Sequence, residues 1–214
     1  MSRKKLIRTK EFPYHLTARA NNREAFPGDL EYVWNIFISE LYLQYLCHRI
    51  RVHAFVLMPN HFHLIVTSPE RDIDLVMKEF LGSSTRILNI KCGRSGHVFG
   101  GRYFWSLIKE PAYYAHALKY VYRNPVKASL CESVLDYPFS SYACLMGQRH
   151  LPFPIYPPEQ QLERLLPEEI QAMDRWLNSP HKAEQNEAIK RGLKRKEFQF
   201  TADPETRRAT IFEI

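Results

Sequence analysis

Two strand-like runs separated by only two turn residues constrain the fold of this chain most strongly. Residues 48–58 and 61–68 are rich in β-branched and aromatic side chains, and Pro59-Asn60 stands between them. Proline and asparagine favour a tight turn, so the two runs are predicted to pair as an antiparallel hairpin. Because side chains alternate along a strand, every second residue of each run should lie on the same face of a sheet.

The segments on either side of the hairpin alternate between strand and helix patterns. Residues 12–19 and 102–109 alternate apolar and polar side chains, which predicts two more strands. Apolar residues at helical spacing predict helices over residues 29–47 and 72–91. The resulting order, β-α-β-β-α-β, indicates a ferredoxin-like (RRM-like) α+β fold with a four-stranded antiparallel sheet and helices on one face.

The same spacing predicts which faces of the helices are buried. The first helix should bury Val33, Ile36, Phe37, Leu41, Leu43 and Leu46, and the second should bury Ile73, Val76, Met77, Phe80 and Leu81. A third helix begins at Pro111, a position that proline tolerates. It is expected to end near Arg123, because Pro125 disfavours helical geometry in the residue before it.

The composition changes near residue 150, which divides the chain into a main domain, residues 1–150, and an extension, residues 151–214. Four prolines lie within residues 151–158 and indicate a stiff connector. Apolar residues between Leu162 and Leu177 predict two short helices interrupted at Pro167. The charged, basic tail after Pro180 is expected to be only partly ordered.

Charge and cysteine content limit the classes of protein. The net charge of +7 and pI of about 9.2 fit either a polyanionic partner or simple solubility. None of the four cysteines forms a C-x-x-C pair, so we expect reduced thiols in a cytoplasmic protein. The basic N-terminus lacks the apolar run of a secretory signal, and the most apolar stretch, residues 55–66, is too short and too polar to span a bilayer.

The triplet His61-Phe62-His63 is the first candidate functional group. Residues two apart on a strand share a face, so both imidazoles should leave the sheet together while Phe62 and Leu64 enter the core. Two neighbouring imidazoles form half of a typical site for a divalent metal. Two unrelated histidines on a strand would give the same triplet, so the pattern alone leaves both interpretations open.

A second candidate group lies on the third predicted helix. His116, Tyr120 and Asn124 are spaced by four residues and share one helical face, with Tyr113 on the same side. A packing tyrosine with a solvated hydroxyl and a helix-capping asparagine would give the same spacing. If this helix crosses the face that carries the histidines, however, it would bring a phenol to a bound metal.

Five segments, in order, resemble the HUH single-tyrosine transposases, and among these the REP-associated tyrosine transposases. They are residues 14–19 (YHLTAR), 58–66 (MPNHFHLIV), 99–103 (FGGRY), 120–128 (YVYRNPVKA) and 137–142 (YPFSSY). Together they cover roughly residues 10 to 147. Five collinear motifs are much more specific than any one of them.

The resemblance implies roles for individual residues. Tyr120 falls on the nucleophile, His61 and His63 fall on the metal ligands, and Asn124 falls on a frequent position of a third ligand. Tyr122 is the alternative nucleophile. On a helix it points about 200° away from Tyr120, so at most one of the two phenols can face the histidines.

The resemblance also implies the reaction and the partner. Members cut single-stranded DNA, often beside a short hairpin, through a 5′-phosphotyrosine intermediate, and they rejoin strands in DNA transposition and recombination. Arg19, Arg102 and Lys127 lie within the matching motifs and are candidate DNA contacts. We expect Mg²⁺ or Mn²⁺, with two histidines better suited to manganese. A monomer and a homodimer are both consistent with the family, as is a nucleoid-associated location in the cytoplasm.

Two other functions remain as alternatives at this point. A domesticated binding protein could grip hairpin DNA or RNA without cutting, using the exposed aromatic residues of the sheet. For the DNA-cutting enzyme, Tyr103, Phe104 and Trp105 beside Arg102 are candidates for stacking on the bases of a single strand. Alternation along a strand must also bury some of these three aromatic residues. A metal-dependent hydrolase of small phosphate esters would need carboxylate ligands, but Asp72 and Asp74 stand at a predicted helix start, where capping explains them.

Overall fold

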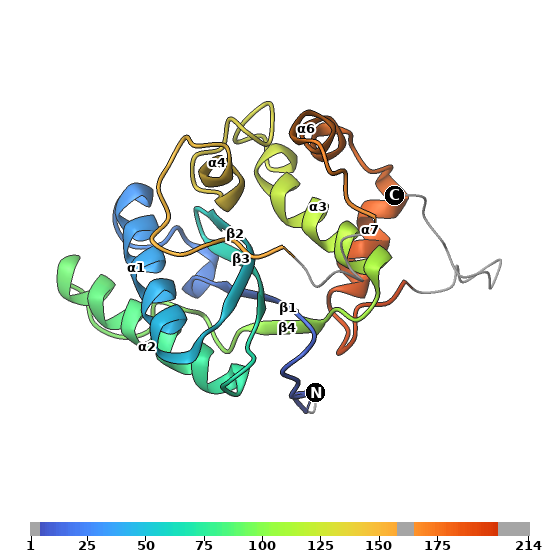
Figure 1. Ribbon diagram of the computed structural model, residues 1–214. Coiled ribbons are helices and arrows are strands. Elements are labelled where there is room, and N and C mark those ends of the chain that lie inside the picture. The colour runs from blue at the N-terminus through green and yellow to red at the C-terminus, as the bar shows by residue number, and fades with distance from the viewer. Residues whose placement is uncertain (1–4, 158–164, 201–214) are drawn as a thin grey trace.

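A four-stranded antiparallel sheet in the order β2-β3-β1-β4 forms the centre of the computed structural model (Figure 1). The structure describes residues 5–157 and 165–200. The strands are β1 (Tyr14–Arg19), β2 (Arg51–Met58), β3 (His61–Thr67) and β4 (Phe104–Leu107). The ferredoxin-like α+β prediction is thereby confirmed, including the hairpin at Pro59-Asn60, although β4 is shorter than the predicted range 102–109.

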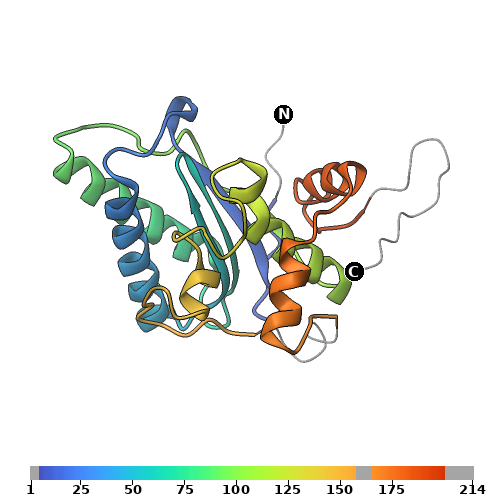
Figure 2. The ribbon, with the colours of Figure 1, turned by 90° about the horizontal axis from the view of Figure 1, so that it is seen from above.

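Helices cover both faces of this sheet. The helices α1 (Leu30–His48) and α2 (Ile73–Lys91) lie on one face, and α3 (Pro111–Lys127), α6 (Ile170–Asn178) and α7 (Ala183–Gly192) lie on the other (Figure 2). The short helix α4 (Ser141–Leu145) packs near β2. None of the helices within the described residues is long and apolar enough to cross a membrane.

Each face of the sheet has its own apolar core. Beneath α1 and α2 the core includes Phe37, Phe62 and Phe80, all fully buried. Beneath α3 the core includes Ile65 of β3 and Tyr114 of α3. The two cores follow the strand alternation: Phe62 and Leu64 of β3 belong to the first, as predicted, while His63 and Ile65 lie on the α3 side.

The predicted buried stripe of α1 is wrong at its C-terminal end. Asp29 caps the helix by accepting the Glu31 N–H at 3.0 Å, and the helix ends at Arg49 with a left-handed φ of 51°. Leu43 and Leu46 are 47% and 45% exposed. Because each helical residue turns about 100°, Leu46 points to the side opposite Phe37, away from the core.

The helix α3 does not end near Arg123 but continues through Pro125 to Lys127. Proline removes a backbone donor, yet here it lies in the last turn, so few helical hydrogen bonds depend on it. The Asn124 side-chain amide donates to the Tyr120 carbonyl at 2.8 Å, and the Ala128 N–H donates to the Asn124 carbonyl at 3.0 Å. These bonds hold the end of the helix despite the proline.

From α6 to Phe200 the extension packs onto the α3 face, whereas Phe153 near its start belongs to the core beneath α1 and α2. Of the tail after Pro180, which was predicted to be partly ordered, the structure describes the residues up to Phe200, and here Ile189, Leu193 and Phe198 are buried in the α3 core. Of the two short helices predicted before Pro180, α6 is described, while residues 158–164, at the start of the other, lie outside the described residues.

Segments from outside the sheet bind both of its outer strands. On β4, the Leu107 N–H donates to the Lys196 carbonyl at 2.9 Å, and the Phe198 N–H donates to the Leu107 carbonyl at 2.7 Å. On β2, the Leu57 N–H donates to the Phe139 carbonyl at 2.9 Å. The C-terminal segment thus runs beside β4, and the chain around α4 runs beside β2.

Candidate active site

His61 and His63 lie on β3 and face α3, as the strand alternation predicts. Their ring centroids are 5.0 Å apart, with the ring planes at 81°. Across the sheet, His61 pairs with Met58 and Arg19, and His63 pairs with Val56 and Thr17. The two imidazoles therefore stand side by side on one face of the sheet.

A third histidine, His15 of β1, belongs to the same cluster. Its Nε2 lies 2.9 Å from Nδ1 of His63, and the two rings stack with centroids 5.1 Å apart. His15 and His63 are 3% and 6% exposed, so α3 and the sheet enclose this contact. Sequence reasoning missed His15, although its alternation with Tyr14 and Leu16 could have placed it on the histidine face.

The other ring, His61, is held from the turn of the hairpin. Its Nδ1 lies 2.7 Å from Oδ1 of Asn60. The amide of Asn60 is fixed in turn, because its Nδ2 donates to the Arg23 carbonyl at 2.9 Å. Oδ1 can only accept, so His61 carries its proton on Nδ1 and leaves Nε2 as a free lone pair.

Burial keeps the three imidazoles neutral. It lowers the pKa of His15 to about 3 and, with the nearby charge of Arg19, lowers the pKa of His61 to about 4. The pKa of His63 also falls well below 6.5, chiefly through burial and then through His15 and His61. Neutral imidazoles are the form that can bind a metal ion.

Tyr120 of α3 contacts this histidine cluster from the side of the sheet that α3 covers. Its ring is edge-on to His63 at a centroid distance of 5.7 Å and to His15 at 6.5 Å. Burial raises the pKa of the Tyr120 phenol, and the carboxylate of Glu187 on α7 raises it further. The structure therefore brings together the tyrosine and the histidine pair singled out from the sequence.

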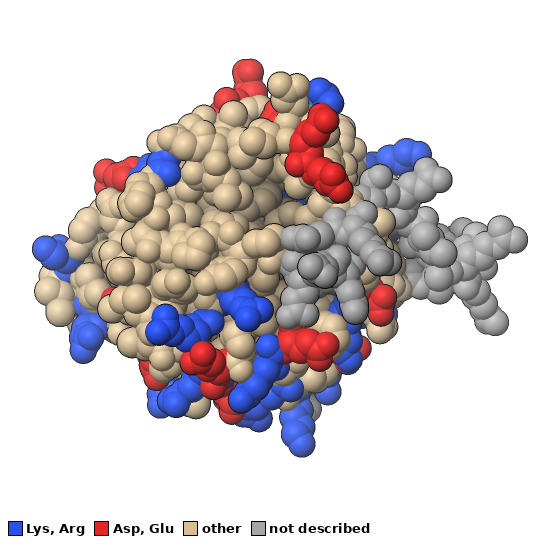
Figure 3. Space-filling model, in the orientation of Figure 1, with Lys and Arg blue, Asp and Glu red and all other residues tan. Residues whose placement is uncertain are grey.

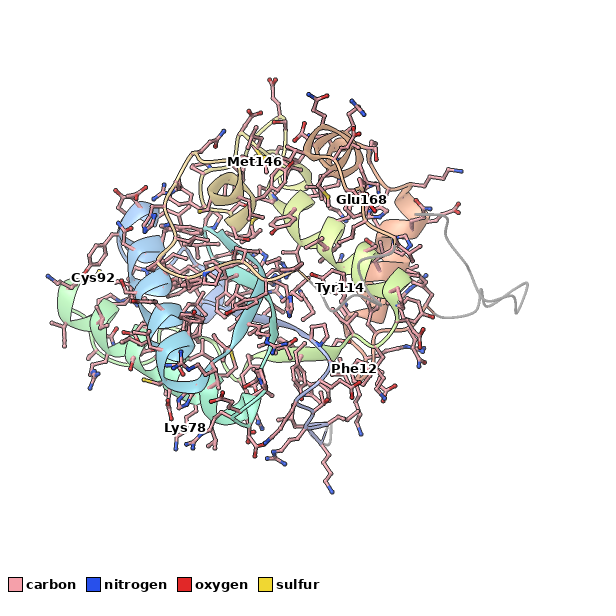
Figure 4. All side chains as sticks on the ribbon, viewed as in Figure 1. Phe12, Lys78, Cys92, Tyr114, Met146 and Glu168 are labelled. Carbon is pink, nitrogen blue, oxygen red and sulfur yellow. The ribbon has the colours of Figure 1, made fainter. Side chains whose placement is uncertain are left out.

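Tyr114 anchors α3 on the sheet and so helps to set the position of Tyr120. It is 1% exposed and packs edge-on to His53 of β2, with ring centroids 6.1 Å apart (Tyr114 is labelled in Figure 4). His116 and Tyr113, which the sequence placed on the same helical face as Tyr120, have other partners. His116 lies 3.3 Å from His181, and Tyr113 packs on Phe198. Both thus contact the extension.

Tyr122 points away from the histidines, as helical geometry predicts. Its hydroxyl lies 3.0 Å from Oγ of Ser141, and its ring packs on Tyr142. Burial raises its pKa strongly. Asn124 is also directed elsewhere, since its amide nitrogen bonds the carbonyl of Tyr120 within the same helix.

The three candidate DNA contacts are exposed but lie in different places. Arg19 neighbours His61 across the sheet. Arg102 precedes β4, and its guanidinium lies 5.6 Å from the centre of the Tyr103 ring. Lys127 is the last residue of α3. Lysine and arginine gather on the lower part of the surface in Figure 3, the region where Figure 1 draws β4 and the N-terminal segment.

Comparison with known proteins gives consistent matches. Residues 8–124 match the sequence model of the family described as IS200-like transposases. A REP-associated tyrosine transposase of Escherichia coli (strain K12) is 33% identical over 97 residues, which are 42% of this chain and 53% of that protein. A putative REP-associated tyrosine transposase of Haemophilus influenzae (strain ATCC 51907 / DSM 11121 / KW20 / Rd) is 31% identical over 100 residues, 42% of this chain and 57% of that protein.

A solved structure has the same fold. It is a REP-associated tyrosine transposase bound to a REP hairpin, with a TM-score of 0.59 and 22% identity, covering 78% of this chain and all of that one. The chain spans about half the length of the curated relatives it matches.

Proposed function

Because this chain belongs to the IS200-like transposase family, we propose that it is a metal-dependent single-strand DNA endonuclease and strand transferase that cuts beside hairpin DNA. The observation that carries this proposal is the meeting of Tyr120 with the histidine pair, its ring 5.7 Å from that of His63. A phenol beside two neutral imidazoles combines a nucleophile with half of a metal site.

The residues present fit a divalent metal of the kind the family implies. The Nδ1 atoms of His61 and His63 have neighbours within hydrogen-bond distance, which leaves both Nε2 atoms as the candidate ligands. Within residues 5–157 and 165–200, no group of three His, Cys, Asp or Glu side chains is arranged to hold a metal. Asn124 is the proposed third ligand and would have to turn from its helix. Bound Mg²⁺ or Mn²⁺ would withdraw charge from the phosphate that is cut.

Tyr120 is the proposed nucleophile. Its oxygen would bond to phosphorus while the bond from phosphorus to the 3′ oxygen breaks. The phenol loses a proton in this step, and the departing 3′ oxygen gains one. One strand then ends in a 3′ hydroxyl, and the other stays joined to Tyr120 through its 5′ phosphate. Because the phosphodiester energy is kept in this bond, rejoining needs no nucleotide cofactor.

Hairpin-bearing single-stranded DNA is the proposed substrate, acted on in the cytoplasm. The fold relative whose structure includes a REP hairpin supports this choice. Arg19 is the most direct candidate for a phosphate contact, because it lies beside His61 on an exposed position. Arg102 and Lys127 are proposed as more distant contacts.

We also propose that residues 1–150 are the catalytic domain and that residues 151–214 form an extension whose helix α6 supports the nucleophile helix. The contacts of α6 with α3 favour this role. Arg123 of α3 donates to the carbonyls of Leu177 and Asn178, and Lys119 donates to Ser179 Oγ at 2.8 Å.

The test is formation of a covalent adduct. Labelled DNA with a hairpin and a single-stranded flank, incubated with the protein and Mn²⁺ or Mg²⁺, should give an adduct that survives denaturing electrophoresis. Tyr120→Phe should give none. Tyr122→Phe is the matched control. It also removes a tyrosine hydroxyl from α3, but this hydroxyl faces Ser141 and not the histidines, so the variant should still form the adduct.

Two outcomes would contradict the proposal. One is a wild-type protein that forms no adduct with either metal, and the other is a Tyr120→Phe variant that still forms one. Tight hairpin binding that survives a chelator, without an adduct, would support the non-catalytic binding protein instead.

A further inference from the structure

Only part of the histidine face is covered by α3. Beneath the helix, His15 and its cross-strand neighbours Ile65 and Ser106 are buried. Two residues further along β1 the surface opens: Thr17 is half-buried and Arg19 is exposed. His61, next to Arg19, is also half-buried. An open strip of sheet therefore continues from His61 toward the β4 edge, beside the buried His63.

Phe104 lies at the end of this strip. The register places Val56, His63, Thr17 and Phe104 in one row across the four strands. Residues directly opposite one another share a face, so Phe104 stands on the side that carries the histidines. Neighbouring strands are about 4.8 Å apart, which puts Phe104 about 10 Å from His63 across the sheet.

The exposure of Phe104 contrasts with that of its neighbours. Tyr103 and Trp105 are 6% and 8% exposed and belong to the core beneath α1 and α2, whereas Phe104 is 68% exposed. A single exposed apolar side chain needs no explanation by itself. Phe104 is different because of its place, in the same row as His63 and on the same open strip as Arg19.

We propose that Phe104 is the stacking platform for an unpaired nucleobase next to the phosphate that Tyr120 attacks, with Arg19 holding the backbone of the same strand. Every nucleobase has a flat face that can stack on an aromatic ring, and a single strand leaves that face free. Among the described residues, no carboxylate pairs with Arg19, so its guanidinium is available to a phosphate. The occupant of the strip is therefore a single strand of DNA.

This inference rests on the proposed function, but it can be tested without cleavage. The probe is a DNA hairpin with a single-stranded oligothymidylate flank that carries 2-aminopurine at one flank position at a time. Binding is measured in EDTA, so no strand is cut. Stacking on Phe104 should quench the fluorescence of 2-aminopurine at one flank position more than at the others.

Three variants define the expected result. Phe104→Ala should abolish the position-specific quenching and weaken binding roughly 5- to 150-fold, the range found for stacking aromatic residues. Phe104→Trp should preserve both. Ile90→Ala is the control for loss of an exposed apolar side chain, because Ile90 is 72% exposed on α2, on the other side of the sheet.

The outcomes separate this site from the catalytic proposal. If Phe104→Ala binds the probe as tightly as wild type with the same quenching profile, or if wild type does not bind the probe, the stacking site is wrong. If quenching depends on Phe104 but no covalent adduct forms in any metal, the stacking site stands and the cleavage proposal fails. If wild type and Phe104→Ala both form adducts and bind the probe with equal affinity, the cleavage proposal stands and the stacking site fails.

Discussion

Nε2 of His15 lies 2.9 Å from Nδ1 of His63, and both rings are buried between α3 and the sheet. Since both rings are neutral, one nitrogen must donate and the other accept. If His63 binds a metal through Nε2, its proton is on Nδ1 and His15 is the acceptor. His15 would then do for His63 what Asn60 does for His61, which is to fix the ring and its tautomer.

Replacing His15 should therefore weaken metal binding before any DNA is added. We expect His15→Phe to lower the affinity for Mn²⁺ about 10- to 100-fold, the usual effect of losing such a partner. Titration calorimetry on the DNA-free protein measures this, and long-range ¹H–¹⁵N spectra of the histidine rings report the tautomer of His63. His97→Asn, at an exposed position, is the control. An unchanged Mn²⁺ affinity in a folded His15→Phe protein would contradict the role of His15.

The two tyrosines of α3 should differ in what they stabilise. Tyr122→Phe removes a buried hydroxyl that contacts Ser141 Oγ at 3.0 Å, and we expect the free energy of unfolding to fall by about 1 kcal/mol. Tyr120→Phe should lower the free energy of unfolding by less, because the Tyr120 ring faces the histidine cluster of the candidate active site. Urea denaturation of both variants checks this order, and a larger loss for Tyr120→Phe would argue that its hydroxyl is structural.

Acid should destabilise the protein through buried histidines, of which His53 is the clearest outside the site. Its Nδ1 must donate to the Tyr156 carbonyl at 3.1 Å, so its Nε2 accepts from the Thr67 hydroxyl at 2.8 Å, an arrangement that needs the neutral ring. Burial lowers the pKa of His53 from 6.5 to about 4. The unfolded chain binds the proton first, so stability is lost as pH falls from 6.5 to 4, by about 2 kcal/mol at pH 5.

Unfolding of wild type and His53→Gln across this pH range tests that expectation. The variant should be less stable near neutrality but should lose less stability on acidification, because one titrating group is gone. His97→Gln, at an exposed position, should keep the wild-type slope. Equal slopes for His53→Gln and wild type would show that His53 is not kept neutral by the fold.

A methyl group at Gly192 should loosen the extension. A Cβ there would lie 2.6 Å from Cε2 of Phe198 and 2.9 Å from the carbonyl of Gln199. Overpacking of this kind costs about 1–3 kcal/mol. We expect Gly192→Ala to lower the midpoint of urea unfolding, whereas Gly101→Ala, with no atom within 4 Å of its Cβ, should change it little. Identical midpoints would mean that Phe198 contributes little to the core.

Local patterns predicted the parts of this site that depend on one segment. Alternation along β3 was enough to place His61 and His63 together, and helical spacing was enough to separate Tyr120 from Tyr122. The partnership of His15 with His63 depends on the register between two strands far apart in the chain, which no local pattern encodes. Phe198 was missed for a similar reason, because an apolar residue among charges is buried only when a distant surface receives it.

The backbone bonds along the outer strands restrict how two copies of this chain could associate. Outer strands commonly join a second molecule by continuing its sheet. Here Leu107 of β4 already exchanges both of its backbone hydrogen bonds with Lys196 and Phe198, and Leu57 of β2 is bonded to Phe139. At these positions a neighbour would first have to displace the chain's own segments.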